Sequence, residues 1–277
     1  MLSYRHSFHA GNHADVLKHI ILIEILEHLC KKDSAFDYID THAGAGLYNL
    51  HSEHATKLQE YSQGIAKLSS EEWPELVTYF DTLAKHNSSG QQHLYPGSPL
   101  IAIDFLRKKD RAWLYELHPK DAELLLKNTA KTRNVRVMRD DGFKGLLSLL
   151  PPVSRRGLVL IDPSYEIKTD YGKVFTVLDE AYKKFPTGTY ALWYPVVDRK
   201  NIDQLERKFI RSGIKKIQRF ELGIRQDQFG TGMSASGMII INPPWTLMDK
   251  MSTILPKLVA SLGADGAFYK ADELVGE

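Results

Sequence analysis

Hydrophobic and polar positions along the chain follow two periods. Short runs of β-branched and aromatic residues, several of them ending in Asp, Glu or Asn before a turn, predict β-strands. Segments with helical periodicity separate these runs, and the alternation is typical of an α/β fold whose mostly parallel sheet has helices on both faces. Seven strands are predicted: Phe36–Asp40, Trp113–Leu117, Val135–Arg139, Leu158–Asp162, Thr189–Pro195, Lys215–Ile224 and Gly237–Asn242.

The two ends of this pattern depart from simple alternation. Asp15–Lys31 precedes the first strand and predicts an amphipathic helix with a broad apolar face. The last two strands are joined by the Gly- and Ser-rich stretch Gly230–Gly237, which leaves no room for a crossover helix. We therefore expect these strands to form an antiparallel hairpin, so that the seven-stranded sheet is mixed, with an antiparallel last strand.

The first crossover of the sheet is longer than such folds need. In dinucleotide-binding folds an acidic residue at the end of the second strand follows the glycine-rich turn by about 20 residues. Here Asp40 and Glu116, which end the first two strands, are 76 positions apart. We therefore predict a main domain made of residues 1–46 and 96–277, with a helical subdomain inserted at residues 47–95.

The inserted subdomain has two predicted helices, Ser52–Leu68 and Glu71–His86, followed by the polar loop NSSGQQ. An insertion at the carboxyl edge of a sheet lies beside the ligand crevice, so it is suited to holding a substrate. A purely stabilising role fits the sequence equally well.

Composition excludes several classes of protein. The 277 residues are 43% hydrophobic and 25% charged, with a net charge of +2. This balance excludes a disordered chain and a fibrous protein. Cys30 is the only cysteine, which excludes an internal disulfide and a thiolate zinc site and favours a reducing compartment. Neither a secretory signal nor a membrane span is evident, so a cytoplasmic location is expected. His9 and His13 are spaced like metal ligands but lack partners, so no metal is expected.

Candidate chemistry begins at the end of the first strand, in the motif DTHAGAG (Asp40–Gly46). Its glycines allow backbone N–H groups to approach a ligand closely, although the third glycine of the dinucleotide pattern is missing. An ordinary tight turn explains this motif equally well. Glu116 would lie at the tip of the adjacent strand, where a carboxylate can accept both ribose hydroxyls of a nucleoside. Asp141 follows the third strand and could accept an adenine amino hydrogen.

A second motif, DPSYE (Asp162–Glu166), follows the fourth strand and resembles the Asp/Asn-Pro-Pro-aromatic motif of amino-methyltransferases. An adenine amino nitrogen is a poor nucleophile because its lone pair is delocalised into the ring. Asp162 and the carbonyl of Pro163 would accept its two hydrogens, and Tyr165 would stack on the extruded base. An Asp-Pro turn after a buried strand is the plain structural alternative.

A similar motif, Asn242-Pro243-Pro244-Trp245, follows the last strand. Because that strand is predicted to be antiparallel, its end should lie at the opposite edge of the sheet from the glycine turn. We therefore expect a structural role, in which the prolines end the strand and Trp245 packs down onto the protein.

Basic residues are concentrated between Arg199 and Arg219, where eight Lys or Arg stand against two acidic residues. Lys200, Arg207, Lys208 and Arg211 share one face of a predicted helix, which suits a nucleic-acid backbone. A solvated helix face is the alternative.

Segments spread through the chain match the pattern of one known family: MLSYRHSFHAGNHADVLKH, DTHAGAG, YPGSPL, ELHP, PPVSRRGL, IDPSYE, KTDY, GTYALWYPVV and SGMIIINPPW. In these segments the chain resembles a bacterial family of 23S ribosomal RNA adenine-N6 methyltransferases. The resemblance extends from Met1 to about Trp245, whereas the last thirty residues carry no information. It implies a class I, Rossmann-like methyltransferase fold, S-adenosylmethionine as the methyl donor, and one adenine of 23S ribosomal RNA, not yet assembled into the ribosome, as the acceptor.

The resemblance also assigns roles to residues. It makes Asp162 the catalytic residue and gives Tyr4 a role in handling the RNA, with Lys18 in the same N-terminal block as a further substrate-binding candidate. Pro163 and Tyr165 keep the contacts with the target base that the DPSYE motif predicts. Where the family has a second proline, this chain has Ser164, so the loop is expected to be less rigid with its chemistry unchanged. Contacts with the cofactor would fall on His19, His42, Ser98, Glu116, Asp141, Gly142 and Asp162.

The sequence thus favours an RNA adenine-N6 methyltransferase that acts as a monomer, without a membrane or an obligate protein partner. Two alternatives stay open. A DNA adenine methyltransferase would use the same pocket chemistry, and a non-catalytic RNA-binding assembly protein would keep the fold without a cofactor site. A nicotinamide-dependent dehydrogenase is disfavoured because the third glycine is missing.

Overall fold

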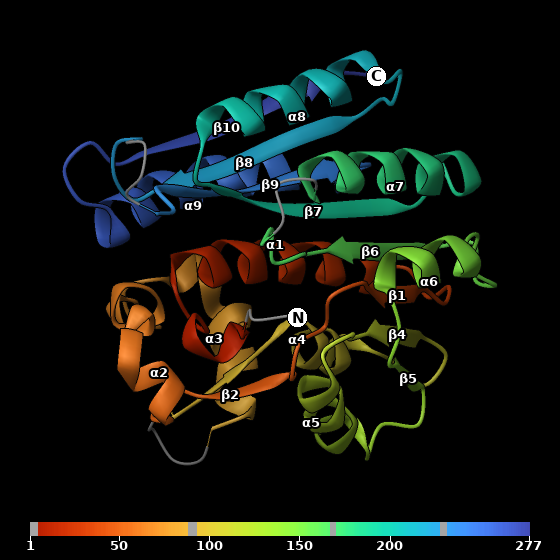
Figure 1. Cartoon of the computed structure of the whole chain (residues 1–277), viewed down its shortest axis with the longest axis horizontal. Helices are drawn as coiled ribbons and strands as arrows, with labels where there is room; N and C mark the ends of the chain where they lie inside the picture. The colour runs from red at the N-terminus through yellow and green to blue at the C-terminus, as the bar shows by residue number, and fades with distance from the viewer. Residues whose placement is uncertain (1–4, 88–92, 167–169, 228–231) are drawn as a thin grey trace.

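The computed structural model describes residues 5–87, 93–166, 170–227 and 232–277, and its centre is an eight-stranded sheet (Figure 1). The strand order is β10-β8-β9-β7-β6-β1-β4-β5. Strands β5, β4, β1, β6 and β7 pair in parallel, whereas β9 is antiparallel to both β7 and β8. The strands are β1 Asp37–Asp40, β4 Arg111–Tyr115, β5 Val135–Met138, β6 Gly157–Ile161, β7 Thr189–Val196, β8 Ile217–Gly223, β9 Ala235–Ile241 and β10 Phe268–Val275.

This sheet confirms the predicted α/β class, the mixed sheet and the antiparallel hairpin formed by β8 and β9. The predicted number of seven strands is wrong, because β10 pairs antiparallel with β8 at the sheet edge. Its sequence, FYKADELV, shows no apolar alternation, since most of its side chains are half-exposed at the edge. A strand signal that depends on a buried face is therefore weak there.

Helices cover both faces of the sheet (Figure 1). Neighbouring residues of a strand point to opposite faces. On β6, Leu158 and Leu160 share a core with α1, α3, α4 and α9, whereas Val159 and Ile161 pack with α6, α7 and α8. The bounds are α1 His13–Cys30, α3 Val77–Lys85, α4 Ser98–Phe105, α5 Pro119–Thr129, α6 Gly142–Leu149, α7 Asp170–Lys184, α8 Arg199–Arg211 and α9 Leu247–Leu262.

Helix α1 confirms the first predicted helix and begins two residues earlier than expected. The side chain of Asn12 caps it by accepting hydrogen bonds from the backbone N–H groups of Ala14 and Asp15, at 2.9 and 3.0 Å. Nearly all of its side chains are buried, because the sheet, α3, α4 and α9 surround it. The helix therefore carries the polar residues Lys18 and His19 into the interior, next to the strand ends.

The insertion between β1 and β4 is less helical than predicted. It contains a two-stranded antiparallel sheet of β2 and β3, with α2, α3 and short 3₁₀ turns between them. The predicted helix Ser52–Leu68 ends early because Gln59 adopts a left-handed conformation, with φ of 52°. The new elements are β2 Leu47–Asn49, α2 Glu53–Leu58, the 3₁₀ turns Glu60–Gln63, Ile65–Lys67 and Pro74–Leu76, and β3 Leu94–Pro96.

This insertion shares its core with the rest of the protein, since Tyr48, Trp73 and Tyr79 belong to the same hydrophobic cluster as α1. The division into residues 1–46 and 96–277 and an inserted 47–95 stays a prediction. Most of the predicted polar loop NSSGQQ falls at residues 88–92, outside the described part of the chain.

The Asn242–Trp245 motif follows β9 and lies at the edge of the sheet where β6 and β7 begin, as predicted. The predicted packing of Trp245 is wrong, because its side chain is 80% exposed. Pro244 is buried in its place and anchors the turn. No described helix is both long and apolar enough to cross a membrane.

Candidate active site at the carboxyl ends of the parallel strands

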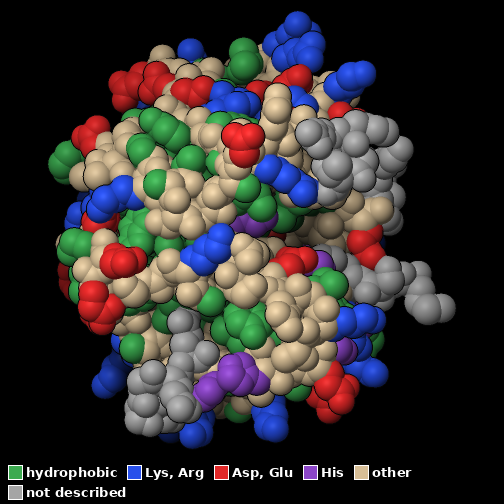
Figure 2. Space-filling model, turned by 90° about the vertical axis from the view of Figure 1, so that its left-hand side faces the viewer, with side chains coloured by type: hydrophobic (Ala, Val, Ile, Leu, Met, Phe, Trp, Pro, Cys, Tyr) green, Lys and Arg blue, Asp and Glu red, His purple; other side chains and the backbone are tan. Residues whose placement is uncertain are grey.

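A cavity of about 960 Å³ opens where the parallel strands end. Figure 2 looks onto this side of the molecule, where histidine, acidic and basic side chains surround a depression. Carboxyl ends of parallel strands meet at one edge, which is where ligands bind in open α/β sheets. Tyr4 lies outside the described residues. The other predicted site residues all line the cavity: Lys18, His19, His42, Ser98, Glu116, Asp141, Gly142, Asp162, Pro163 and Tyr165.

A buried ion-pair network connects the cavity to helix α1. The ammonium nitrogen of Lys18 lies 2.6 Å from Oδ2 of Asp162 and 2.8 Å from Oδ1 of Asp15. His6 contacts the other oxygen of Asp15 at 2.9 Å. Within the described residues, Oδ1 of Asp162 has no hydrogen-bond partner. This oxygen can therefore accept a hydrogen bond from a ligand.

The charges in this network support one another. Burial by itself would raise the pKa of Asp15, but His6 and Lys18 hold that pKa well below its usual range. Burial would likewise lower the pKa of Lys18, and the two carboxylates raise it above the usual value. Lys18 is thus a buried, charged group that fixes the orientation of the Asp162 carboxylate.

Glu116 is held by the glycine turn that follows β1. One carboxylate oxygen accepts a hydrogen bond from the backbone N–H of Gly44 at 2.8 Å, and the other accepts one from the backbone N–H of His118 at 2.6 Å. Gly44 has a φ of 62°, the left-handed region that suits glycine. A carboxylate held in this way retains lone pairs for a diol, the hydrogen-bonding pattern of a ribose.

Asp141 and Gly142 form the start of α6. The Asp141 side chain caps this helix by accepting from the N–H of Phe143 at 2.9 Å. A Cβ at position 142 would lie 2.0 Å from the carbonyl oxygen of Thr41, so only glycine allows the two segments to pack this closely. The ring of Phe143 lies 4.9 Å from that of His42, and together they give this part of the cavity an aromatic wall.

Two histidines face the same cavity, of which His19 is buried and His42 is partly buried. Burial lowers the pKa of His19 to about 3 and that of His42 to about 4, so both are neutral at pH 7. Nδ1 of His19 pairs with the hydroxyl of Tyr95 at 2.9 Å, whereas its Nε2 is buried without a partner in the described chain. An unsatisfied buried nitrogen at a cavity wall is a contact for a polar ligand.

The predicted base platform, Tyr165, sits in an aromatic cluster. Its hydroxyl donates to the carbonyl oxygen of Trp193 at 2.7 Å, and its ring centre lies 4.6 Å from that of Tyr171. Tyr165 has a φ of 53°, an unfavourable conformation for a tyrosine that these contacts hold in place. These contacts hold Tyr165 in place although Ser164 stands where the related motif has a second proline.

Sequence reasoning missed the roles of two residues here. Asp15 holds Lys18, and its signal was an acidic residue three positions before a lysine in a mainly apolar helix. Asp40 accepts hydrogen bonds from Ser98 and Tyr38, each at 2.7 Å, and burial raises its pKa to about 6. The Ser98 hydroxyl, which lines the cavity, is therefore already hydrogen-bonded to Asp40.

Two other features considered in the sequence are a metal site and the basic cluster between Arg199 and Arg219. Among the described residues, no group of three or more His, Cys, Asp or Glu side chains could hold a metal ion. In the predicted basic cluster, Arg199 pairs with Glu221 and Asp227, and Arg219 pairs with Glu206 and Asp272. Those two arginines stabilise the fold, while Arg207, Lys208 and Arg211 are exposed on α8, and their role in RNA binding stays a prediction.

The geometry of this cavity suits a nucleoside-containing cofactor. Glu116 offers a carboxylate for a ribose, the start of α6 and Phe143 offer a flat apolar wall for a purine, and His19 offers an unpaired nitrogen. Asp162 lines the same cavity.

Comparison with known proteins identifies the family. A family model described as "Ribosomal RNA large subunit methyltransferase D, RlmJ" matches residues 33–273. The chain belongs to this family. It is 53% identical over 264 residues to "Ribosomal RNA large subunit methyltransferase J" of Escherichia coli (strain K12), covering 95% of this chain and 94% of that protein. It is 50% identical over 269 residues to the protein of the same name from Haemophilus influenzae (strain ATCC 51907 / DSM 11121 / KW20 / Rd), covering 96% of each.

A solved structure has the same architecture as this methyltransferase. The crystal structure of a protein from Legionella pneumophila str. Philadelphia 1 is 37% identical and superposes with a TM-score of 0.88, covering 96% of this chain and 98% of the other. The methyltransferase therefore shares its fold over nearly its full length with a solved relative, which includes the strand ends that form the cavity.

We expect the buried histidines to make stability depend on pH. Burial lowers the pKa of His13 to about 4, whereas an unfolded histidine titrates near 6.5. Between these values the unfolded chain binds more protons, so His13 should lower the free energy of unfolding by up to about 1.4 kcal/mol per pH unit as the pH falls. In urea denaturation across this window, His13→Gln should have a flatter stability profile than the wild type.

Carboxyls with raised pKa values, such as Asp40, titrate in the opposite sense, so the difference between wild type and variant is the informative quantity. His51→Gln, at an exposed position, provides the matched control. Parallel profiles for the wild type and His13→Gln would contradict the assignment of His13 as a buried neutral group.

Proposed function

We propose that this protein transfers a methyl group from S-adenosylmethionine to the N6 amino group of one adenine in 23S ribosomal RNA, adenine 2030 at the family site. We also propose that it acts on RNA that is not yet assembled into the ribosome. The observation that carries this proposal is Asp162, which heads a DPSY sequence at the end of β6 and is fixed by Lys18 beside a nucleoside-sized cavity. Membership of a ribosomal RNA methyltransferase family supports the choice of acceptor.

In this proposal the methyl donor occupies the part of the cavity between the glycine turn and α6. Glu116 would accept the ribose hydroxyls, while Asp141 and Gly142 would bind the adenine edge. His19, His42 and Ser98 would complete the contacts, and their fixed partners leave little to reorganise on binding. When bound, S-adenosylmethionine supplies an electrophilic methyl group attached to a sulfonium.

The target adenine would enter beside Asp162. Its amino group would donate one hydrogen to the free oxygen of Asp162 and the other to the carbonyl of Pro163, which draws the nitrogen toward tetrahedral geometry and frees its lone pair. Tyr165 would stack on the base. The nitrogen becomes strongly acidic only once it is alkylated, so its proton leaves during or after transfer and Asp162 need not remove it beforehand.

Lys18, which lines the cavity, would act on the target base through Asp162. Tyr4 would contact the RNA, and the exposed cations of α8 would contact the phosphate backbone. We propose that the protein acts as a monomer in the cytoplasm, where the unassembled RNA is found. Size-exclusion chromatography with light scattering tests the monomer.

The direct test measures methyl transfer from labelled S-adenosylmethionine to a 23S ribosomal RNA transcript. We expect one N6-methyladenine per transcript, located by mass spectrometry of nuclease fragments, and far less transfer to assembled large subunits. A transcript with the target adenine changed to guanine serves as the control. Equal transfer to a DNA copy of the same sequence would favour a DNA adenine methyltransferase.

A non-catalytic assembly protein makes a different prediction. It would bind the transcript, but calorimetry would detect no site for S-adenosylmethionine. That result would overturn the proposed activity while leaving the RNA as a partner.

A further inference from the structure

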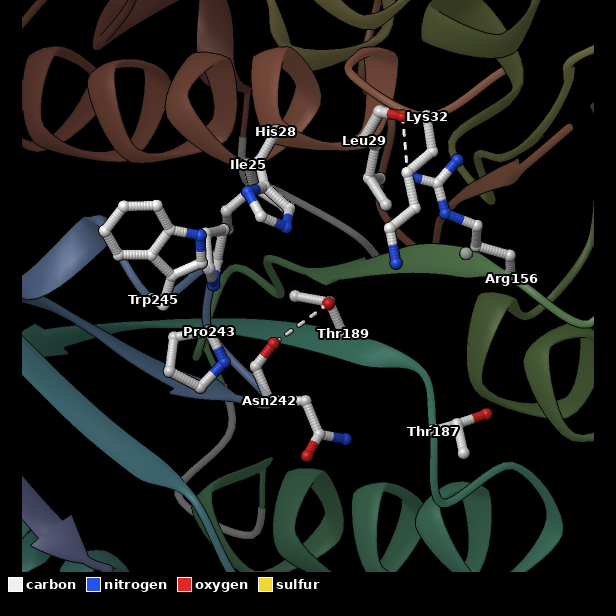
Figure 3. Close-up of a pocket in the computed structure, with 12 residues that line it drawn as sticks. Ile25, His28, Leu29, Lys32, Arg156, Thr187, Thr189, Asn242, Pro243 and Trp245 are labelled. Carbon is white, nitrogen blue, oxygen red and sulfur yellow. Dashed lines mark hydrogen bonds between the residues drawn. The ribbon is translucent and has the colours of Figure 1, made fainter. Parts of the chain in front are cut away.

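A second cavity, of about 380 Å³, lies at the opposite edge of the sheet from the candidate active site (Figure 3). Its walls come from the end of α1, the starts of β6 and β7, and the Asn242–Trp245 turn after β9. It is separated from Asp162 by the length of β6, five residues or roughly 16 Å of extended chain. The residues that carry the following argument are His28, Lys32, Arg156, Thr189, Asn242 and Trp245.

The turn that carries Trp245 is held rigidly. Asn242 adopts a left-handed conformation with φ of 52°, and its side-chain amide donates to the carbonyl oxygens of Pro186 and Gly188, at 2.8 and 2.7 Å. The hydroxyl of Thr189 donates to the Asn242 carbonyl at 3.0 Å. These bonds fix the direction of the chain, and Trp245 points outward with 80% of its side chain exposed. A large aromatic ring kept in water on a rigid turn is a ready stacking surface.

Two cations lie across the cavity from this ring, and neither is neutralised. Arg156 donates to the backbone carbonyls of Leu29 and Ser34, at 2.6 and 3.0 Å. Figure 3 shows the Lys32 amine pointing into the cavity. Among the described residues, no carboxylate pairs with Arg156 or Lys32, and the cavity lining contains no acidic side chain. Fixed positive charge without a counter-ion attracts an anionic ligand.

A third feature lies between the ring and the cations. His28 is next to Trp245 in Figure 3, and its Nδ1 is buried without a hydrogen-bond partner in the described chain. Burial lowers the pKa of His28, and the nearby Lys31, Arg156 and Lys32 lower it further. The imidazole is therefore a neutral polar group that can bond to the edge of a flat heterocycle.

We propose that this Trp245 cavity binds an unpaired nucleotide of the RNA substrate, with its base stacked on Trp245 and its phosphate held by Lys32 and Arg156. The proposal rests on the proposed function for the identity of the RNA. It adds a second contact on the far side of the sheet, for a segment of RNA distinct from the target adenine. One exposed ring beside bare cations suits a nucleotide better than a protein, because stable protein interfaces bury about 800 Å² per partner.

Fluorescence anisotropy of a labelled single-stranded oligoadenylate, measured without methyl donor, tests the site. Trp245→Ala should raise the Kd of the oligonucleotide about tenfold, as expected for the loss of one stacked base. Trp245→Tyr should retain most of the affinity. Lys32→Gln should weaken binding and reduce its salt dependence by about one counter-ion. Tyr269→Ala removes another exposed aromatic ring, from β10, and should behave like the wild type.

Tryptophan fluorescence gives an independent readout, because Trp73 is buried and Trp245 is the highly exposed one among the four tryptophans. Oligoadenylate should quench the wild type more strongly than Trp245→Phe, which retains Trp193 in the candidate active site. Equal affinities of Trp245→Ala and the wild type would overturn the proposal. Adenosine monophosphate binding as tightly as the oligonucleotide would also overturn it, in favour of a free-nucleotide site.

The two proposals fail separately. If oligoadenylate causes no Trp245-dependent quenching in an enzyme that still methylates the transcript, the proposed Trp245 site is wrong and the proposed function stands. Quenching that depends on Trp245, in a protein that methylates no RNA, keeps the nucleotide site and removes the proposed activity.

Discussion

Replacing Asp162 with alanine is expected to abolish methyl transfer while S-adenosylmethionine still binds within about tenfold of the wild-type Kd. In the proposed mechanism, the alanine removes the oxygen that accepts the adenine amino hydrogen, so the nitrogen would no longer be held with its lone pair toward the methyl group. Losses of this kind are about 10²–10⁴-fold in kcat. Single-turnover methylation of the transcript measures the rate, and calorimetry measures donor binding.

Glu116→Gln is the complementary variant. In the proposed mechanism Glu116 binds the ribose of the donor, away from the transferred group, so its loss should raise the donor Kd about tenfold or more and leave kcat near normal at saturating donor. Glu123→Gln, at an exposed position on α5, is the matched control. Near-normal turnover of Asp162→Ala would remove Asp162 from the mechanism, and equal effects of both variants on kcat would show that the two roles are not separate.

Replacing Lys18 with methionine is expected to have the largest effect on stability. Lys18 is 4% exposed and neutralises both Asp15 and Asp162, so methionine would leave two carboxylates without their cation. Breaking a buried pair in this way costs about 3–5 kcal/mol. Urea denaturation at pH 7 should show this loss in the free energy of unfolding, with Lys31→Met, an exposed lysine at the end of α1, unchanged.

A second substitution tests whether the cause is the unpaired charge. Adding Asp15→Asn to Lys18→Met removes one of the two orphaned carboxylates and should recover part of the stability. Methylation should stay low in the double variant, because Asp162 still lacks the lysine that orients it. A Lys18→Met protein as stable as Lys31→Met would show that the network contributes nothing to folding.

The fold was largely predictable because it follows from local patterns. Strands buried on both faces, such as β6, carry long apolar runs, and the acidic residues that end them, such as Asp162, follow directly in the sequence. Element β10 escaped prediction because an edge strand with half-exposed side chains has no such run. The early end of α2 at Gln59 depends on contacts of the insertion with the N-terminal segment, which the local pattern does not contain.

The candidate site divides in the same way. Glu116, Asp141 and Asp162 were found because topology alone brings the ends of parallel strands to one edge. The bridge from Lys18 to Asp162 joins residues 144 positions apart, and the support of Lys18 by Asp15 became visible only with the packing of α1. For Trp245 the prediction was wrong, because the ring was expected to pack against the protein and is instead 80% exposed.

By itself, the sequence determined the α/β class, the order of the parallel strands along the chain and the acidic residues at their ends. These features depend on the side-chain period within one segment, which each segment carries on its own. Only the tertiary structure decided which charges are paired, which histidines are buried and neutral, and which aromatic ring is left in water. Those properties depend on which distant segments pack together, because burial and partners, rather than residue type, set the energy of a polar or aromatic group.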